Sequence, residues 1–265
     1  IKDGEWHNML IFGDNLQILK TLLRMKEEGE LKNADGTKGV RLIYIDPPFA
    51  TKQEFMAKNG EKAYQDKIIG AQFLEWLRKR LILMRELLTH DGSIYVHLDN
   101  RMIHYVKIIM DEVFSHSFRN EIIWAKGREG SGESNLPTEY QNILLYKKYP
   151  TARPLWNPPK RGYSLSTVKN IQKDKSGWYY TRGRGSDPRG SLKTYVWRNP
   201  NTPKDKVIEI ITSPKYEGAL VGDIWDDVDN KVVMHFPTEK PEQLLERVIK
   251  ASSNEGDIVL DAFAG

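Results

Sequence analysis

The stretch Arg41-Leu42-Ile43-Tyr44-Ile45-Asp46-Pro47-Pro48-Phe49 decides how this chain folds. The run that ends at Ile45 is apolar and rich in β-forming side chains, so it predicts a buried strand. An acid and two prolines stop the run, so we expect a rigid loop that presents a carboxylate and an aromatic ring together. Such a tip suits a flat ring that bears an amino group.

The chemistry of that amino group accounts for each residue type at the tip. An amino group on a nucleobase is a poor nucleophile, because its lone pair is delocalised into the ring. The Asp46 carboxylate and the Pro47 carbonyl can accept its hydrogen bonds and raise the electron density on nitrogen. Pro48 removes a further N–H donor, and Phe49 offers a stacking face worth about 1–3 kcal/mol. In an ordinary turn, Asp46 would instead cap a backbone group and Phe49 would pack inward.

A second informative block lies near the end of the sequence. It contains His235-Phe236-Pro237-Thr238-Glu239-Lys240-Pro241, a helical stretch to Ser252, and Asp257-Ile258-Val259-Leu260-Asp261-Ala262-Phe263-Ala264-Gly265. The two blocks resemble the catalytic and cofactor motifs of amino-methylating DNA methyltransferases. The catalytic block comes first here, an order similar to the circularly permuted β class, which includes the modification subunits of restriction systems.

This resemblance covers most of residues 8–147 and 216–265 and implies a fold. That fold is an α/β, Rossmann-like sheet of S-adenosylmethionine-dependent methyltransferases, circularly permuted, with helices on both faces and an inserted target-recognition region. The implied domains are a catalytic domain of residues 1–146 and 216–265 and a basic target-recognition region of residues 147–215.

The resemblance also implies where S-adenosyl-L-methionine binds. Asp261, Phe263 and Gly265 match the loop that cradles the cofactor, and a glycine lets the backbone approach a ligand closely. Thr238 and Lys240 match residues near its methionine end, where Lys240 could pair with the carboxylate. Alternatively, Lys240 is a solvated lysine at a helix start.

Asp14 is a further candidate for cofactor binding. It follows Met9-Leu10-Ile11-Phe12, which predicts a short strand, and it precedes a helix with an apolar stripe. Ligands of doubly wound sheets lie beyond the carboxyl ends of strands, and the resemblance suggests that Asp14 lies near the adenine or ribose. A helix N-cap is an equally good interpretation.

Periodicity predicts the other elements of the catalytic domain. Apolar residues at three- and four-residue spacing predict a helix from Phe73 to Leu88, and its basic residues on other faces, Arg80 among them, are expected to be solvated. Ser93–Asp99, Glu121–Trp124, Asn142–Tyr146 and Ile258–Asp261 read as strands, and Pro241 suits the first position of a helix. The polar stretch 50–70 suits a lid or a DNA-contacting loop.

Charge is distributed unevenly along the chain. Residues 147–215 carry 16 Lys and Arg against four Asp and Glu, whereas the remainder carries 24 against 32. Eight Trp and Tyr residues are interleaved with these charges, a composition typical of surfaces that neutralise phosphates and contact bases. We expect this segment to bind DNA through side chains that include Arg182, Arg184, Arg189 and Lys193. The alternative is a solvated insertion with its own aromatic core, and both can hold.

Composition excludes several classes of protein. A chain of 265 residues accommodates one α/β domain plus an insertion. It has no cysteine, which excludes a disulfide framework, and its six histidines form no metal-type pair, so no metal is expected. No apolar run approaches the ~18–20 residues of a membrane span, and no signal peptide is visible. We expect a bacterial or archaeal cytoplasmic protein associated with the nucleoid.

The function that these features favour is S-adenosylmethionine-dependent methylation of adenine N6 in duplex DNA. A restriction subunit and a second copy of the chain are the further expected partners. Cytosine-N4 methyltransferases use the same chemistry, but relatives of that kind more often carry Ser in place of Asp46. A methyltransferase for RNA or a small amine is another alternative, although a small substrate does not need a basic insertion.

The ends of the chain add one expectation. The family continues beyond its glycine loop with a helix and a strand whose terminal acid holds the cofactor ribose, whereas this chain stops at Gly265 and begins at Ile1. We therefore expect a fragment in which the cofactor site is incomplete and binds weakly. A truncated, non-catalytic DNA-binding module is the corresponding alternative.

Overall fold

The computed structural model describes residues 8–48, 71–129, 136–182, 192–213, 215–228 and 239–264. The chain forms two compact units. The first, here called the sheet unit, comprises Ile1–Asn157 and Asp223–Gly265, and the second, the inserted unit, comprises Pro158–Gly222.

The sheet unit is built on a six-stranded sheet with the strand order β10-β3-β4-β2-β1-β11. Strand β1 runs parallel to β2 and β11, and β10 runs parallel to β3, whereas β4 is antiparallel to both β2 and β3. The strand that carries the Asp46 motif thus precedes, and lies beside, the strand that carries the Asp261 motif. The bounds are β1 Val40–Ile45, β2 Leu88–Leu98, β3 Phe118–Glu129, β4 Thr138–Lys147, β10 Ile224–Trp225 and β11 Val259–Leu260.

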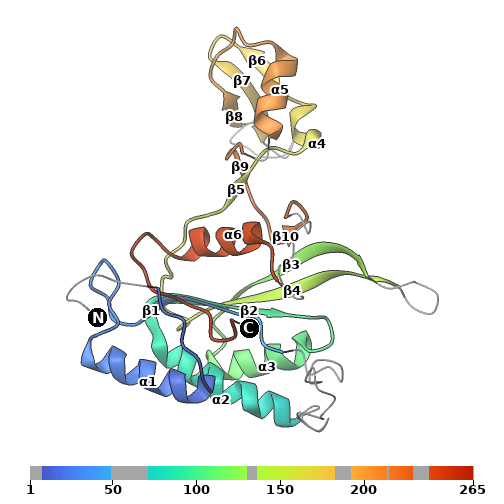
Figure 1. Cartoon of the computed structure of the whole chain (residues 1–265). Helices are drawn as coiled ribbons and strands as arrows, with labels where there is room; N and C mark the ends of the chain where they lie inside the picture. Colours follow the sequence, from blue (N-terminus) through green and yellow to red (C-terminus); the bar gives the residue numbers. More distant parts are fainter. Residues whose placement is uncertain are drawn as a thin grey trace. The chain divides into compact units, whose positions relative to one another are not determined.

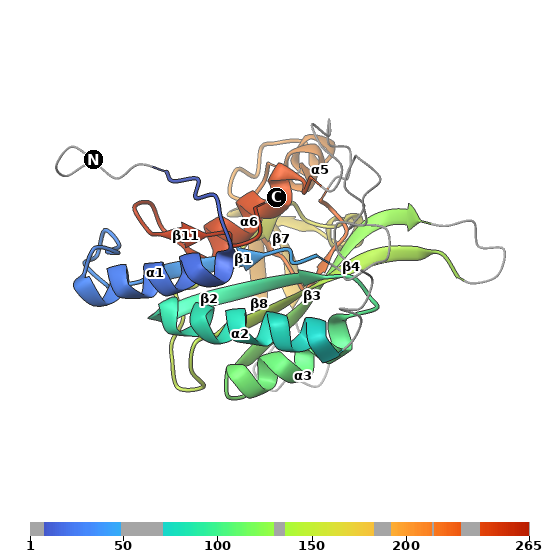
Figure 2. The same cartoon turned by 60° about the horizontal axis from the view of Figure 1, so that its bottom comes forward.

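Helices cover both faces of this sheet, as the sequence predicted. Figure 1 shows α1, α2 and α3 beneath the sheet and α6 above it, and the rotated view agrees (Figure 2). The apolar stripe of α2 is buried at Phe73, Leu77, Leu81 and Met84, which confirms the predicted helix. The bounds are α1 Asn15–Glu28, α2 Ala71–Leu87, α3 Ile103–Val113 and α6 Glu242–Ser252.

Strand β1 lies in the interior of the sheet and is buried along its whole length. A strand covered by helices on both faces needs side chains that tolerate burial in both directions, which explains its almost unbroken apolar run. The exception is Arg41 at its start, whose side chain is 1% exposed. The guanidinium pairs with Asp91 of β2, with Asp35 at 2.5 Å and with Asp257 at 3.3 Å, so one strand and two loops supply its counter-charges.

The predicted strand Met9–Phe12 is wrong. These residues form no strand, and the side chains of Leu10 and Phe12 are almost wholly exposed. Within the described ranges no strand pairs with them, so this apolar run has neither ladder hydrogen bonds nor a face to bury.

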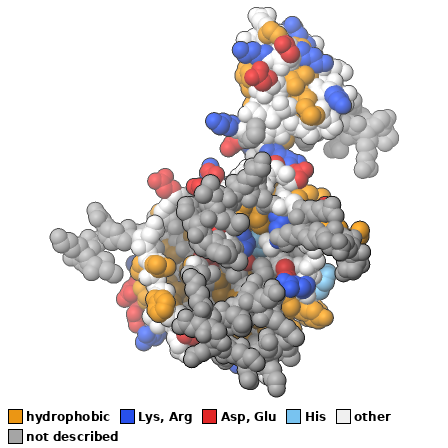
Figure 3. All heavy atoms as spheres, turned by 45° about the vertical axis from the view of Figure 1, so that its right-hand side comes forward, with side chains coloured by type: hydrophobic (Ala, Val, Ile, Leu, Met, Phe, Trp, Pro, Cys, Tyr) orange, Lys and Arg blue, Asp and Glu red, His pale blue; other side chains and the backbone are white. Residues whose placement is uncertain are grey.

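The inserted unit packs a short helix against a three-stranded antiparallel sheet. Val207 and Ile211 of α5 (Lys204–Thr212) contact a cluster that includes Trp178, Tyr180 and Val196. Trp178 therefore belongs to a small core, as expected. Basic and hydrophobic side chains lie together on the surface of this unit (Figure 3). Its other elements are β5 Lys160–Arg161, α4 Leu165–Val168, β6 Gln172–Asp174, β7 Gly177–Arg182, β8 Leu192–Trp197 and β9 Ala219–Leu220.

The bounds of the inserted unit differ from the predicted segment 147–215. Residues up to Asn157 belong to the sheet unit, where the Asn157 N–H donates to the carbonyl of Ala251 in α6 at 2.8 Å. At the other end, β9 pairs with β5, so the unit extends to Gly222. Charge composition alone gives no information about these backbone hydrogen bonds. No helix among the described residues is long and apolar enough to cross a membrane.

Candidate active site

The tip of β1 brings together two residues that the sequence proposed for different tasks. Asp46 follows the last residue of β1, and the buried Pro47, which comes next, restricts the backbone of the loop. Its carboxylate forms an ion pair with the ammonium of Lys240, which lies 194 residues away and just before α6. The Asp46 and Lys240 side chains are 22% and 12% exposed, so both charges are largely removed from water.

Asp261 adds a second carboxylate at this end of the sheet. The register of β1 and β11 pairs Ile43 with Leu260, which places Asp261 immediately beyond the paired residues. Its Oδ1 accepts a hydrogen bond of 2.9 Å from the Phe263 N–H. Desolvation by the surrounding protein, followed by the negative charge of Asp46, raises the pKa of Asp261, although the residue reaches solvent and Lys240 opposes the rise.

A chain of neutral polar groups lies beside these charges. The Tyr44 hydroxyl is 2.6 Å from His97 Nδ1, and His97 Nε2 is 2.8 Å from Gln141 Oε1. Because Gln141 Oε1 can only accept, Nε2 carries the proton and Nδ1 accepts from Tyr44. Burial, and next the charge of Lys240, lowers the pKa of His97 to about 3, so the ring is neutral at ordinary pH. Sequence reasoning did not single out this network.

Asp14 is a helix N-cap, which was one of its two proposed roles. Its Oδ1 accepts from the Gln17 N–H at 3.2 Å, and Arg80 Nη2 lies 3.4 Å from Oδ2. Its neighbour Asn15 makes the longer-range contacts, since Nδ2 donates to the Ala262 carbonyl at 2.9 Å and Oδ1 accepts from Arg80 Nε at 2.6 Å. The start of α1 is thereby tied to the Asp261–Phe263 segment.

Arg80 corrects the expectation that the basic residues of α2 are solvated. The residue is 4% exposed, and its guanidinium lies 3.9 Å from the centre of the Trp76 ring. Periodicity missed this because the apolar stem and the planar guanidinium of an arginine can be buried against an aromatic ring when acceptors are near. Asn15 and Asp14 supply those acceptors.

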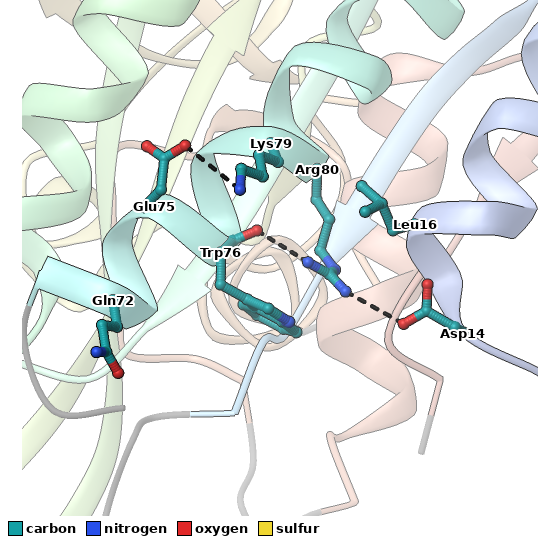
Figure 4. Close-up of a pocket in the computed structure, with 7 residues that line it drawn as sticks. All are labelled: Asp14, Leu16, Gln72, Glu75, Trp76, Lys79 and Arg80. Atoms are coloured by element: carbon teal, nitrogen blue, oxygen red, sulfur yellow. Dashed lines mark hydrogen bonds and ion pairs between the residues drawn. The ribbon is translucent and has the colours of Figure 1, made fainter. Parts of the chain in front are cut away.

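An open pocket of about 590 Å³ lies between the start of α1 and α2 (Figure 4). Its volume is in the range of small-molecule sites. Trp76 also contacts Phe263, with ring centres 5.6 Å apart, so the pocket adjoins the Asp261–Phe263 segment. Asp46 and Lys240 do not line it. The lining residues are Asp14, Leu16, Gln72, Glu75, Trp76, Lys79 and Arg80.

The inserted unit presents the predicted DNA-contacting residue Lys193 on β8. Its ammonium lies 2.7 Å from Asp174 and 4.3 Å from the centre of the Tyr179 ring. Asp174 also accepts from the Tyr195 hydroxyl at 2.8 Å. The hydrogen bonds from Lys193 and from the Ser176 N–H lower the pKa of Asp174 to about 2, so it remains a carboxylate.

Several predicted site residues have no structural account. Phe49, Thr238, Gly265, Arg184 and Arg189 lie outside the described residues, as does the stretch 50–70. Arg182 is the last residue of β7. The site that the structure does assemble is Asp46, Lys240 and Asp261 at one end of the sheet, with Asp14 and Phe263 around the adjoining pocket.

Three sequence relatives are named as methyltransferases or as a subunit of a restriction-modification enzyme. Type II methyltransferase M.EcaI of Enterobacter cloacae is 31% identical to 97% of this chain and is covered over 62% of its own length. The Mod subunit of type III restriction-modification enzyme StyLTI of Salmonella typhimurium is 24% identical over 98% of this chain and 48% of its own length. DNA adenine methyltransferase YhdJ of Escherichia coli is 24% identical over 93% of this chain and 71% of its own length. The chain thus spans about half to two thirds of the first two relatives.

A solved structure has the same fold. PvuII DNA methyltransferase, described as cytosine-N4-specific, matches 94% of this chain and 71% of its own length, with a TM-score of 0.50 and 12% identity. Residues 40–265, which include β1, the Asp46 motif and the Asp261 motif, match the family model N6_N4_Mtase, described as DNA methylase. The chain therefore belongs to this DNA methylase family.

Proposed function

We propose that the full-length protein transfers a methyl group from S-adenosyl-L-methionine to N6 of adenine in duplex DNA, as the modification component of a restriction-modification system. The observation that carries the proposal is the Asp46 carboxylate at the tip of a rigid, buried strand, beside Lys240 and Asp261. This site lies at the carboxyl end of parallel strands, where α/β sheets bind their ligands.

The residues present fit the amino-acid group of the cofactor. That group carries one carboxylate and one ammonium, and the described part of the site offers the ammonium of Lys240 together with the carboxylates of Asp46 and Asp261. The adjoining pocket, which Trp76 lines with Phe263 packed against it, suits the flat adenosine end. S-adenosylmethionine supplies a methyl group that its sulfonium centre already activates.

The chain itself positions and polarises the acceptor. The target adenine leaves the base stack, as enzymes that modify bases require. Asp46 and the Pro47 carbonyl accept its amino hydrogens, and Phe49 is proposed as the stacking surface. Hydrogen bonds to the two acceptors would raise the electron density on N6 as the new N–C bond forms, the S–C bond of the donor breaks to leave a neutral thioether, and one N–H proton passes to solvent. Placement and charge stabilisation, with no covalent enzyme intermediate, provide the acceleration.

Adenine is favoured over cytosine by the acid at position 46. The resemblance gives Ser more often at this position in cytosine-N4 enzymes, and the name of YhdJ describes an adenine methyltransferase. The fold shared with PvuII methyltransferase carries no information about the base. Cytosine N4 remains the second candidate because its amino group needs the same acceptors.

The inserted unit is proposed as the target-recognition region. Its β6–β7–β8 sheet presents Lys193, Arg198 and Tyr195, with the Arg198 guanidinium 4.6 Å from the centre of the Tyr195 ring. Cations and aromatic rings on one sheet face can contact phosphates and bases. We also propose a restriction subunit as a partner, pairing of two copies of the chain, and a place on the nucleoid of a bacterial or archaeal cytoplasm.

The product nucleoside tests this proposal. Full-length protein is incubated with methyl-tritiated S-adenosylmethionine and mixed-sequence duplex DNA, and the DNA is digested to nucleosides. We expect the label in N6-methyldeoxyadenosine, and none when inosine, which lacks the amino group, replaces every adenine. Label in cytosine would establish the second candidate, and unlabelled DNA would refute the proposal.

A further inference from the structure

We propose that Lys240 is shared between Asp46 and the carboxylate of the cofactor, so that cofactor binding releases Asp46 for the amino group of the target base. This inference rests on the proposed function and concerns the order in which the same site is filled. It starts from the direct ion pair between the predicted catalytic acid and the predicted cofactor-binding lysine.

Both partners are held by stiff backbone. Asp46 follows β1 directly and precedes two prolines, and Lys240 precedes Pro241, which is the N-cap of α6. Helix α6 is anchored through the buried Leu244 and Val248. A change of partner at Lys240 therefore requires rotation of one side chain and no movement of either element.

The charge balance of the site favours such an exchange. The negative charge of Asp46 contributes to the raised pKa of Asp261, and the positive charge of Lys240 opposes that rise. An ammonium acts as a mobile point charge with three donors. A ligand carboxylate that approaches Lys240 competes with Asp46 for this charge, while the ligand ammonium can pair with the Asp261 carboxylate.

The exchange has a consequence for the chemistry. While Lys240 donates to Asp46, it withdraws electron density from the carboxylate and occupies one of its acceptor positions. In that state Asp46 is a weaker acceptor for an amino group. Once Lys240 turns to the ligand carboxylate, both oxygens of Asp46 can again accept hydrogen bonds from an amino group. The site therefore accepts the base best after the cofactor has bound.

The competition predicts the direction in which loss of the Asp46 charge changes ligand affinity. If Asp46 and the ligand carboxylate compete for Lys240, then removal of the Asp46 charge strengthens binding of ligands that carry a carboxylate. If Asp46 merely holds Lys240 in position, the same change weakens binding. Linkage between two partners of one group is reciprocal, so ligand binding must also weaken the Lys240–Asp46 pair.

Two ligands that share a nucleoside thioether isolate the effect, and neither donates a methyl group. S-adenosylhomocysteine carries the amino-acid group, whereas 5′-methylthioadenosine lacks it. Calorimetric titration of full-length protein should show that Asp46→Asn raises affinity for the first ligand by roughly three- to tenfold. Affinity for 5′-methylthioadenosine should stay unchanged, which also shows that the variant is folded. Asp46→Ser, which removes the same charge, serves as a second variant.

Lys240→Gln completes a double-mutant cycle. It should reduce affinity for S-adenosylhomocysteine and spare 5′-methylthioadenosine, and Asp46→Asn should then have no further effect. Asp227→Asn is the matched control, because Asp227 pairs with Arg247 at 2.8 Å and its loss changes net charge equally. If wild-type protein binds neither ligand, the proposed function fails. If wild-type protein binds S-adenosylhomocysteine and both Asp46 variants bind this ligand as tightly as wild type or more weakly, the exchange is refuted.

Discussion

The two ends of strand β1 each carry a buried or half-buried charge, yet the ends are built differently. At the start, Arg41 is enclosed by three carboxylates and is 1% exposed. Burial alone would lower the pKa of Arg41, but Asp91, Asp257 and Asp35 outweigh it and raise that pKa. At the end, Asp46 pairs with Lys240, Asp261 stands close by with a raised pKa, and the Asp46 side chain is 22% exposed.

The difference separates a structural charge cluster from the cluster that we propose to be functional. The Arg41 cluster joins the first half of β2 to the loops before β1 and β11, so it ties these three strands together at the end of β1 opposite Asp46. The Asp46 end retains more negative charge than one lysine balances, together with access for a ligand. Carboxylates whose pKa is raised by desolvation and by a like charge are typical of active sites.

The largest expected effect on stability belongs to the Arg41 end. Arg41→Met should reduce the free energy of unfolding by about 3–5 kcal/mol, because it leaves carboxylates without their buried cation. Urea unfolding measures the loss. Arg78→Met is the control, since Arg78 pairs with Glu112 on the surface and should change stability little. Equal effects of the two substitutions would contradict the structural role of the cluster.

A second effect, of comparable size over the whole acid range, concerns pH at the Asp46 end. The folded-state pKa of His97, about 3, lies below the ordinary value of 6.5, so the unfolded chain binds a proton first as pH falls. Stability is therefore fully present above about pH 6.5 and declines between about pH 6.5 and 3, by up to about 1.4 kcal/mol per pH unit. Unfolding curves of wild type and His97→Gln across this window measure it. Parallel pH profiles for the two proteins would show that His97 is not held neutral.

The smallest effect on the stability of the sheet unit is expected from substitutions in the basic residues of the insertion, which should instead change DNA binding. Neutralising Arg182, Arg184 and Arg189 together should flatten the salt dependence of DNA binding, by a log–log slope of about 0.9 for each lost phosphate contact. Neutralising Lys204 and Lys206 of α5 is the control. The unfolding free energy of the sheet unit should not change. An unaltered salt slope would mean that these three arginines do not contact phosphates.

Much of the sheet unit was predictable because its signals are local. The apolar run of β1, the periodicity of α2 and the strand before Asp261 each identify an element within one short window. Met9–Phe12 shows the limit of such signals, since an apolar run becomes a strand only beside another strand, and that neighbour is not encoded in the run itself.

The site was predictable in its parts but not in its assembly. Motif resemblance identified Asp46 and Lys240 separately, whereas their direct pairing depends on how α6 and β1 pack. Asn15 and His97 were missed because their hydrogen-bond partners lie at least 44 residues away, and Arg80 because it needs Asn15 and Asp14, 65 and 66 residues away, as well as Trp76. Polar residues that serve long-range contacts carry no periodic signal.

The rate of methyl transfer by Asp46→Asn tests the central claim most directly. The measurement is a single turnover, with full-length protein saturated by S-adenosylmethionine and substrate duplex, alongside the unfolding free energy of the same variant. We predict a loss of at least about 10²-fold in rate, with stability and DNA affinity nearly unchanged, because Asp46 acts on the amino group of the base. A variant that retains the wild-type rate would contradict the assignment of the Asp46 end of β1 as the site of methyl transfer.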